Sequence, residues 1–184
     1  QTICIDNDNL LAGREGTDYL YNLGHRRIGY IGSTNDFMYT ADRRAGYQLS
    51  LLLNGLPVRE DYCIEMAGVH PEKDGPLWEL LNRPDRPTAF VVSDDILALA
   101  LERVCLQMNL SIPKDVSILA FNNSLYAVLA SPQLTSVDIN ADRLGQEAAG
   151  LIINHAENPN LLTSRIIVPH RIVERASCAR LEQK

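Results

Sequence analysis

Short apolar segments alternate with longer segments of helical periodicity along the whole chain, and this alternation limits the possible folds most. Strands joined by helical crossovers run parallel, because each crossover returns the chain to the same edge of the sheet. The expected strands are residues 27–32, 62–66, 88–92, 116–120, 134–137, 166–168 and 172–173, and the expected helices are residues 11–23, 43–54, 72–82, 95–109, 125–130 and 142–156. The pattern predicts an α/β fold with a parallel sheet.

Local signals set the ends of these segments. Gly24 follows the first helix and can adopt the left-handed conformation that closes a helix, and Pro84 stops the third helix. Ser93 or Asp94 is placed to cap the fourth helix. Residues 178–184 are expected to form a frayed polar tail.

The composition indicates an ordinary globular chain with a negative net charge. Hydrophobic residues make up 46% of it, which excludes a disordered tail. Seventeen Lys and Arg stand against 23 Asp and Glu, a net charge of −6. The chain as a whole therefore lacks the basic surface that duplex DNA requires, and another segment would have to make any DNA contact.

The cysteine spacing indicates whether the chain holds a metal, and the apolar segments indicate whether it enters a membrane. Cys4, Cys63, Cys105 and Cys178 are scattered without the spacing of a zinc site, so we expect buried free thiols and no metal. No stretch approaches the roughly 20 apolar residues of a membrane helix, and no secretion signal is visible. We expect a cytoplasmic protein with no membrane partner. Because Gln1 lies at an apolar strand end, we also expect the chain to come from a longer one.

Four strand-to-helix loops carry polar and aromatic residues. They are residues 33–43, 68–74, 93–95 and 121–124. In open parallel sheets, ligands bind beyond the carboxyl ends of the strands, where such loops meet. We expect the four loops to converge on one rim.

Arg43 and Asp94 are the charged candidates on this rim. The Arg43 guanidinium is suited to a two-pronged hydrogen bond to vicinal hydroxyls or a carboxylate, and the alternative is a surface pair with Asp42 or Asp36. Asp94 directly follows a buried strand, so its carboxylate either faces a ligand or caps the next helix. Capping is also open for Asp95.

Four further residues complete the candidate site. The Asn122 amide both donates and accepts, which suits sugar hydroxyls, although asparagines are also common in turns. Phe37 and Tyr39 offer stacking faces for a sugar ring, or pack locally. His70 lines the same cleft or is simply solvated.

Catalytic and cofactor motifs are absent from the sequence. There is no G-x-S-x-G elbow, phosphate-binding loop, H-E-x-x-H zinc motif or G-x-G-x-x-G dinucleotide motif. We therefore expect no cofactor, and a binding protein rather than an enzyme.

Six motifs stand in order along the chain: residues 23–32 (LGHRRIGYIG), 43–47 (RRAGY), 93–98 (SDDILA), 112–123 (IPKDVSILAFNN), 132–137 (PQLTSV) and 175–178 (RASC). Together they resemble one family of bacterial transcription regulators, the lactose-repressor and galactose-repressor (LacI/GalR) family. The resemblance extends from Ile5 to Cys178. It is far more specific than any single motif.

The resemblance implies two Rossmann-like, doubly wound lobes of the periplasmic-binding-protein kind, behind a DNA-binding headpiece. Residues 8–137 would form the C-terminal lobe, residues 138–168 would return to an N-terminal lobe that is mostly absent, and residues 169–184 would form a cross-back strand and tail. Leu144, Leu151, Ile152 and Ile166 would then have apolar surface to cover, and we expect the chain to repack or associate through it.

The resemblance also assigns roles. Arg43 matches the family's effector-gripping arginine, Asp94 and Asn122 match residues that hold sugar hydroxyls, and His70 falls near a cleft-wall position. The chain would be the effector-binding and dimerisation region of a sugar-responsive repressor, a homodimer whose operator DNA is bound by an absent helix-turn-helix headpiece. Residues 96–108 and 125–130 match self-association surfaces.

The chain departs from the family pattern at two site positions. It carries Asp94-Asp95 where the family commonly has asparagine then aspartate, and Asn122 where aspartate is common. The run from Phe121 to Ser124 resembles maltose-operon repressors, which favours a maltose-type saccharide. Two alternatives remain: a periplasmic-type sugar-binding protein of a transporter, and a small α/β enzyme acting on saccharides.

Overall fold

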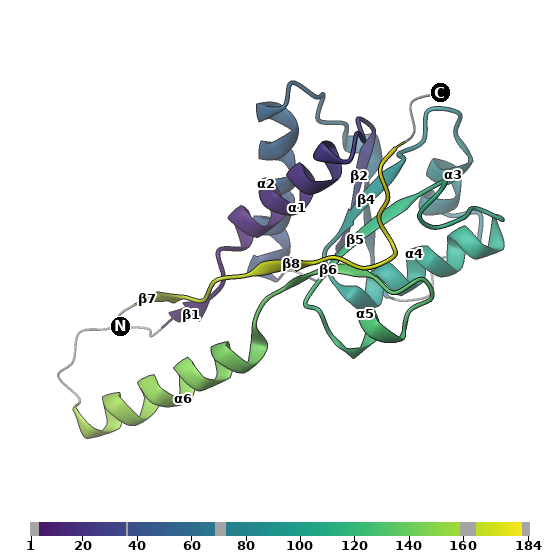
Figure 1. Cartoon of the computed structure of the whole chain (residues 1–184). Helices are drawn as coiled ribbons and strands as arrows, with labels where there is room; N and C mark the ends of the chain where they lie inside the picture. The colour runs from purple at the N-terminus through teal and green to yellow at the C-terminus, as the bar shows by residue number, and fades with distance from the viewer. Residues whose placement is uncertain (1–3, 36, 69–72, 159–164, 182–184) are drawn as a thin grey trace.

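The alternating segments form an open six-stranded sheet in the computed structural model, which describes residues 4–35, 37–68, 73–158 and 165–181 (Figure 1). The strand order is β3 (Cys63–Met66), β2 (Ile28–Ser33), β4 (Ala89–Val92), β5 (Ser117–Phe121), β6 (Thr135–Asp138) and β8 (Arg171–Val173). The first five are parallel and β8 is antiparallel to β6. The predicted α/β fold is confirmed.

Helices cover both faces of this sheet (Figure 1). One face carries α1 (Asn9–Asn22) and α2 (Met38–Leu53), and the other carries α3 (Pro76–Asn82), α4 (Asp95–Gln107) and α5 (Leu125–Leu129). A short 3-10 turn (Glu60–Tyr62) leads into β3. Every residue of β4 is buried, with Phe90 and Val92 facing one helical layer and Ala89 and Val91 facing the other. This two-sided burial explains why the strands are continuous apolar runs.

Glycines let α1 and α2 pack backbone to backbone. A Cβ added at Gly46 would lie 2.1 Å from the carbonyl oxygen of Leu10, and one at Gly13 would lie 2.2 Å from that of Arg43. No larger residue fits at either position without moving a helix, because both obstacles are backbone atoms. The close packing fixes α2, and with it Arg43, against the start of α1.

A smaller unit extends away from the main sheet (Figure 1). It contains the parallel pair β1 (Cys4–Asp6) and β7 (Arg165–Ile167) and the helix α6 (Ala141–Glu157). No residue of α6 is buried, and Ile152 and Ile153 are 66% and 58% exposed. Of the residues expected to need cover, Ile152 is exposed, whereas Leu144, Leu151 and Ile166 are half-buried.

The structure corrects two helix starts and the expected tail. The helix predicted over residues 43–54 begins at Met38, so Tyr39 lies in its first turn and not in a loop; Phe37 makes no side-chain cap that could have marked this start. The helix predicted over 72–82 begins at Pro76. Proline is common at the first position of a helix, because the amide hydrogen that it lacks would have no partner inside the helix there.

The tail from Cys178 to Leu181 makes specific hydrogen bonds, contrary to the expectation that it frays, and residues 182–184 of the predicted tail lie outside the described residues. The amide of Ala179 donates to the Ser117 hydroxyl (3.1 Å), and that of Leu181 donates to the Leu23 carbonyl (2.8 Å). These hydrogen bonds hold the segment across the amino ends of the strands.

All four cysteines are free thiols, as predicted, but Cys4 is exposed and only Cys105 is fully buried. Burial raises the pKa of Cys105 and of Cys178 to about 12, so both stay protonated and unreactive near neutral pH. None of the helices formed by the described residues combines the length and the apolar character needed to cross a membrane.

Candidate functional site

The site lies where the strand order of the sheet reverses. From β2 the chain passes to β3 on one side, and then returns to place β4 on the other side of β2. The loops after β2 and β4 therefore leave in opposite directions, which opens a crevice at the carboxyl ends of these strands. The residues that follow β2, β4 and β5 are brought together there.

Arg43 is the centre of this arrangement. It lies on α2, is 3% exposed, and donates from Nε to the side-chain oxygen of Asn9 at 3.0 Å. Its Nη1 donates to the carbonyl of Ser93 at 2.6 Å and to Oδ1 of Asn122 at 3.3 Å. The predicted meeting of Arg43 and Asn122 is thus found, and within the described residues Arg43 makes no ion pair with Asp42.

Aromatic rings enclose the guanidinium. Its central carbon lies 4.8 Å from the ring centre of Tyr39 and 4.4 Å from that of Phe121. Both rings offer their negative faces to the cation, which offsets part of the cost of burying it. Burial lowers the pKa of Arg43, but an arginine keeps its charge at neutral pH. The site therefore holds a fixed and buried positive charge.

Phe37 extends this aromatic wall toward solvent. Its ring stacks on Tyr39 with centres 5.3 Å apart and an angle of 9° between the planes. Phe37 is 48% exposed, so one of its faces is open. The pair combines the two predicted roles, because Tyr39 packs locally against Arg43 while Phe37 presents a free stacking surface.

Asp94 caps α4. Its Oδ1 accepts the backbone amide of Leu97 at 2.8 Å, so Asp94, and not Ser93, is the cap. The side chain is only half-buried, and its charge favours the charged form of Arg43. Among the described residues no hydrogen bond is made by Oδ2 of Asp94, so capping leaves half of the carboxylate available.

The neighbouring Asp95 is buried and joins the elements that form the rim. It is 1% exposed and accepts the backbone amide of Ser124 at 2.6 Å and the hydroxyl of Ser136 at 2.7 Å. Burial raises the pKa of Asp95 above its usual value. This carboxylate joins the start of α4 to β6 and to the loop after β5, so it holds the rim together and does not face a ligand.

Asn122 and Asn123 combine turn geometry with side-chain contacts. Their φ angles are 95° and 49°, in the left-handed region that asparagine tolerates better than most residues. The Asn123 side-chain oxygen accepts a bond from Arg175 at 2.6 Å, which anchors the turn. This turn directs the side-chain oxygen of Asn122 toward Arg43.

The structure thus gathers Arg43, Asn122, Tyr39 and Phe37, with Asp94 next to the Ser93 carbonyl that Arg43 contacts. His70 lies outside the described residues. Sequence reasoning missed Asn9, the Ser93 carbonyl and Phe121, because only their partners in space give them a role. Among the described residues, no group of three or more His, Cys, Asp or Glu is arranged to hold a metal ion.

Comparison with known proteins identifies the family. The family model of the periplasmic binding protein-like domain matches residues 17–178. The HTH-type transcriptional regulator MalR of Staphylococcus xylosus is 30% identical over 183 residues, which cover 98% of this chain and 53% of that protein. The chain spans about half the length of the curated relatives it matches.

Solved structures show the same fold. A LacI transcriptional regulator from Bacillus cereus subsp. cytotoxis superimposes with a TM-score of 0.87 at 34% identity, covering 97% of this chain and 63% of that one. The complex of the regulator CelR with cellobiose also gives a TM-score of 0.87, at 28% identity, with 96% and 54% covered. The chain therefore belongs to the periplasmic-binding-protein-like domain family and corresponds to the effector-binding region of LacI-family transcription regulators.

Proposed function

We propose that the chain binds a saccharide effector and thereby controls operator binding by a transcription repressor of which it forms the effector-binding region. The observation that carries the proposal is the contact between Arg43 and Asn122 at the switch point of the sheet. It places a fixed cation and an amide where sheets of this kind bind ligands. The repressor acts in the cytoplasm, on operator DNA, through a separate helix-turn-helix headpiece.

The chemistry of the rim suits a sugar. Nη2 of Arg43, which donates to no described residue, is the nitrogen that donates to sugar hydroxyls, Asn122 donates and accepts, and Oδ2 of Asp94 accepts from a hydroxyl. The open face of Phe37 stacks on the apolar face of a sugar ring. The relative CelR was solved with cellobiose, and the loop after β5 favours a maltose-type sugar, so disaccharides are the first candidates.

Control of DNA binding requires two lobes. We assign residues 8–137 to the C-terminal lobe, residues 138–168 to the N-terminal lobe and residues 169–184 to the return. The unburied helix α6 and the separate pair of β1 and β7 support this division. A saccharide that contacts both lobes favours one relative orientation, and that preference is what shifts the population of DNA-binding states.

Calorimetric titration of the full-length repressor with maltose, cellobiose and ribose tests the proposal. We expect one disaccharide to bind, and Arg43→Lys to weaken binding more than tenfold, because lysine cannot reproduce the forked bonds. Arg44→Lys is the matched control. Arg44 is the next residue of α2 but pairs with Glu60 and Glu65 at the surface, so its variant should bind normally.

If no saccharide binds, or if both variants bind equally well, the proposed site is wrong. Two rival functions give different results. A transport-type binding protein would bind sugar without any effect on operator DNA. An enzyme would turn the saccharide over and lose that turnover in Arg43→Ala or Asp94→Ala.

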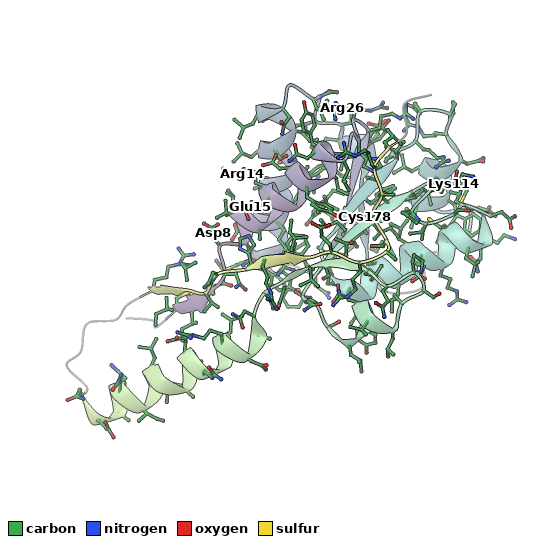
Figure 2. The ribbon with its side chains drawn as sticks, in the orientation of Figure 1. Asp8, Arg14, Glu15, Arg26, Lys114 and Cys178 are labelled. Carbon is green, nitrogen blue, oxygen red and sulfur yellow. The ribbon has the colours of Figure 1, made fainter. Side chains whose placement is uncertain are left out.

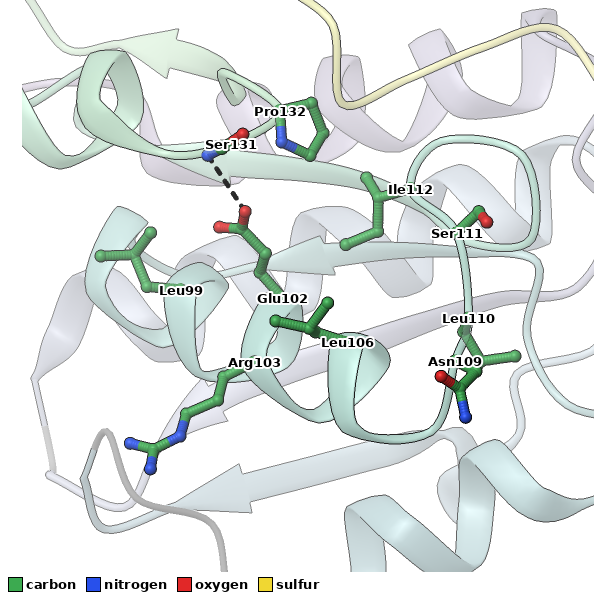
Figure 3. A pocket seen from close by; sticks show the side chains of 10 residues that line it. All are labelled: Leu99, Glu102, Arg103, Leu106, Asn109, Leu110, Ser111, Ile112, Ser131 and Pro132. Carbon is green, nitrogen blue, oxygen red and sulfur yellow. Dashed lines mark hydrogen bonds between the residues drawn. The ribbon is translucent and has the colours of Figure 1, made fainter.

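We also propose that the repressor is a homodimer through α4 and α5. The exposed apolar side chains of this surface are Ile96, Leu106, Leu125, Tyr126, Val128 and Leu129. Beside them lies a groove of about 630 Å³, lined by Leu99, Leu106, Ile112 and Pro132 and bounded by the hydrogen bond from the Ser131 amide to Glu102 (Figure 3). Exposed apolar side chains gathered on two packed helices are typical of an interface, and a second copy of the same face covers them symmetrically.

Sedimentation measures this association. Leu106 is 76% exposed, and Leu106→Glu should shift the protein toward monomer by placing a charge in the interface. Leu53 on α2 is 67% exposed but lies on another face, so Leu53→Glu should leave the dimer intact. A wild-type monomer at micromolar concentration would contradict the proposal.

A further inference from the structure

A second cavity lies at the opposite edge of the sheet from Arg43. It measures about 600 Å³ and opens between the residues that precede β2, β4 and β5 and the C-terminal segment. Figure 2 shows Lys114, one of its lining residues, on the far side of the lobe from Asp8 at the start of α1. The cavity is therefore separate from the proposed saccharide site.

Cationic side chains dominate its lining. Arg27, Arg86, Lys114 and Arg180 line it, and among the described lining residues Asp115 is the one that carries a carboxylate. This concentration of positive charge occurs on a chain whose net charge is −6. The lining of the cavity is thus positively charged although the whole chain is negatively charged. The positive charge is therefore a local feature and does not follow from the composition.

These four cations are not neutralised by carboxylates of the part of the chain that the structure describes. Arg27 and Arg86 donate only to backbone carbonyls, those of Arg86 (3.0 Å) and Asp115 (3.3 Å). The Asp115 carboxylate accepts the backbone amide of Ser111 at 2.7 Å, and it makes no ion pair with these cations.

Arginines elsewhere behave differently. Arg59 and Arg83, for example, share Asp61 and Asp85 in a network of ion pairs. Their donors are already satisfied by carboxylates, whereas no carboxylate of a described residue pairs with the cations of the second cavity. That difference points to a negatively charged ligand.

A buried histidine joins the C-terminal segment to the wall of the cavity. His25 is 2% exposed, and its two ring nitrogens contact the Thr88 hydroxyl at 2.9 Å and the Ala179 carbonyl at 3.1 Å. The contact with Ala179 ties down the segment that carries Arg180. The cavity is thereby formed before any ligand arrives, which reduces the ordering cost of binding.

We propose that this cavity binds a small anion that carries phosphate groups. Arginine and lysine together supply the forked and single donors that phosphate oxygens accept. The volume falls within the range of about 300–1,000 Å³ typical of small-molecule sites, and the concave shape suits a phosphorylated metabolite better than a nucleic acid duplex. The site is independent of the proposed saccharide site.

Calorimetric titration of the full chain with inorganic pyrophosphate tests the proposal, at low salt because salt screens such contacts. We expect saturable binding with one site per chain. The double variant Lys114→Glu, Arg180→Glu should weaken binding at least tenfold. Both residues are exposed, so the fold should persist, and circular dichroism checks that it does.

Lys73→Glu is the control for charge alone, because Lys73 is exposed and lies outside the cavity. Its binding should stay within about twofold of the unmodified chain. Absence of saturable binding would overturn the proposal, and so would equal weakening in the control. Tighter binding of a short single-stranded oligonucleotide than of pyrophosphate would also overturn it, since it would indicate a nucleic acid surface.

Discussion

The side-chain amide of Asn7 donates a 2.9 Å hydrogen bond to the carbonyl of Val168, a residue 161 positions further along the chain. The same nitrogen donates to the carbonyl of Ile139 at 2.9 Å. Asn7 is 3% exposed. The Asn7 side chain therefore joins the three connecting segments that run between the main sheet and the smaller unit.

Replacing Asn7 by alanine should lower the free energy of unfolding by about 1–3 kcal/mol, because the buried carbonyl of Val168 and the half-buried carbonyl of Ile139 lose their donor. Asn7→Asp should be worse, since it directs an acceptor at the same two carbonyls. Asn82→Ala, at an exposed position at the end of α3, should stay within about 0.5 kcal/mol. Urea denaturation measures all three, and an unchanged Asn7→Ala would show that the tie contributes nothing.

Gly46→Ala should destabilise the fold by about 1–3 kcal/mol or more, because its methyl group collides with the Leu10 carbonyl and forces α1 from α2. The same shift displaces Arg43, so saccharide binding should weaken as well. Gly145→Ala in α6 has nothing within 4 Å and should stabilise its helix by roughly 0.5–1 kcal/mol. Thermal unfolding compares the two, and equal effects would contradict the packing argument.

Stability should fall as the pH drops below about 6.5. Burial lowers the pKa of His25, so the folded ring stays neutral where the unfolded ring is already protonated. The unfolded state then binds more protons, and the free energy of unfolding decreases by at most about 1.4 kcal/mol per pH unit. The contribution is fully present above the unfolded pKa and is lost toward the lower, folded one.

Urea titrations at several pH values test this dependence. His25→Gln should flatten the slope, although it should also cost stability at all pH values. His155→Gln, at an exposed position in the last turn of α6, should keep the slope of the unmodified chain. A slope that is the same in all three proteins would assign the pH dependence to other groups.

Asp94→Asn separates the two roles of Asp94. Asparagine caps helices as well as aspartate, so stability should change by less than about 0.5 kcal/mol. Saccharide affinity should fall about tenfold, because a charged acceptor is replaced by a neutral one. Asp94→Ala should lose affinity and also about 1 kcal/mol of stability. Unchanged affinity in Asp94→Asn would leave capping as the residue's sole function.

The sequence predicted the order and kind of nearly every element because period and burial are local properties of the chain. The buried strands over residues 88–92 and 116–120 appear as β4 and β5 with ends shifted by one residue. Ends without a local signal were placed wrongly. The start of α2 at Met38 has no capping side chain, and the tail from Cys178 to Leu181 is held by partners far away in sequence.

The candidate site likewise contains residues that the sequence predicts and residues that only the structure reveals. Arg43, Asp94 and Asn122 could be named in advance because they follow strands whose carboxyl ends share one edge of a parallel sheet. Their partners could not be named, since Asn9 is 34 residues from Arg43 and nothing near it indicates a contact. The cation-lined cavity was also invisible, because its residues come from four separate parts of the chain.

The amino-acid sequence by itself determined the alternation of strands and helices, and so the parallel sheet and the edge where a ligand binds, because these follow from short-range periodicity and from the geometry of crossovers. Only the tertiary structure decided that Asp94 caps α4 while Asp95 joins α4 to β6, and that Tyr39 and Phe121 enclose Arg43. It also decided that four cationic residues line one cavity at the other edge. Those outcomes depend on distances between residues remote in sequence, which packing alone sets.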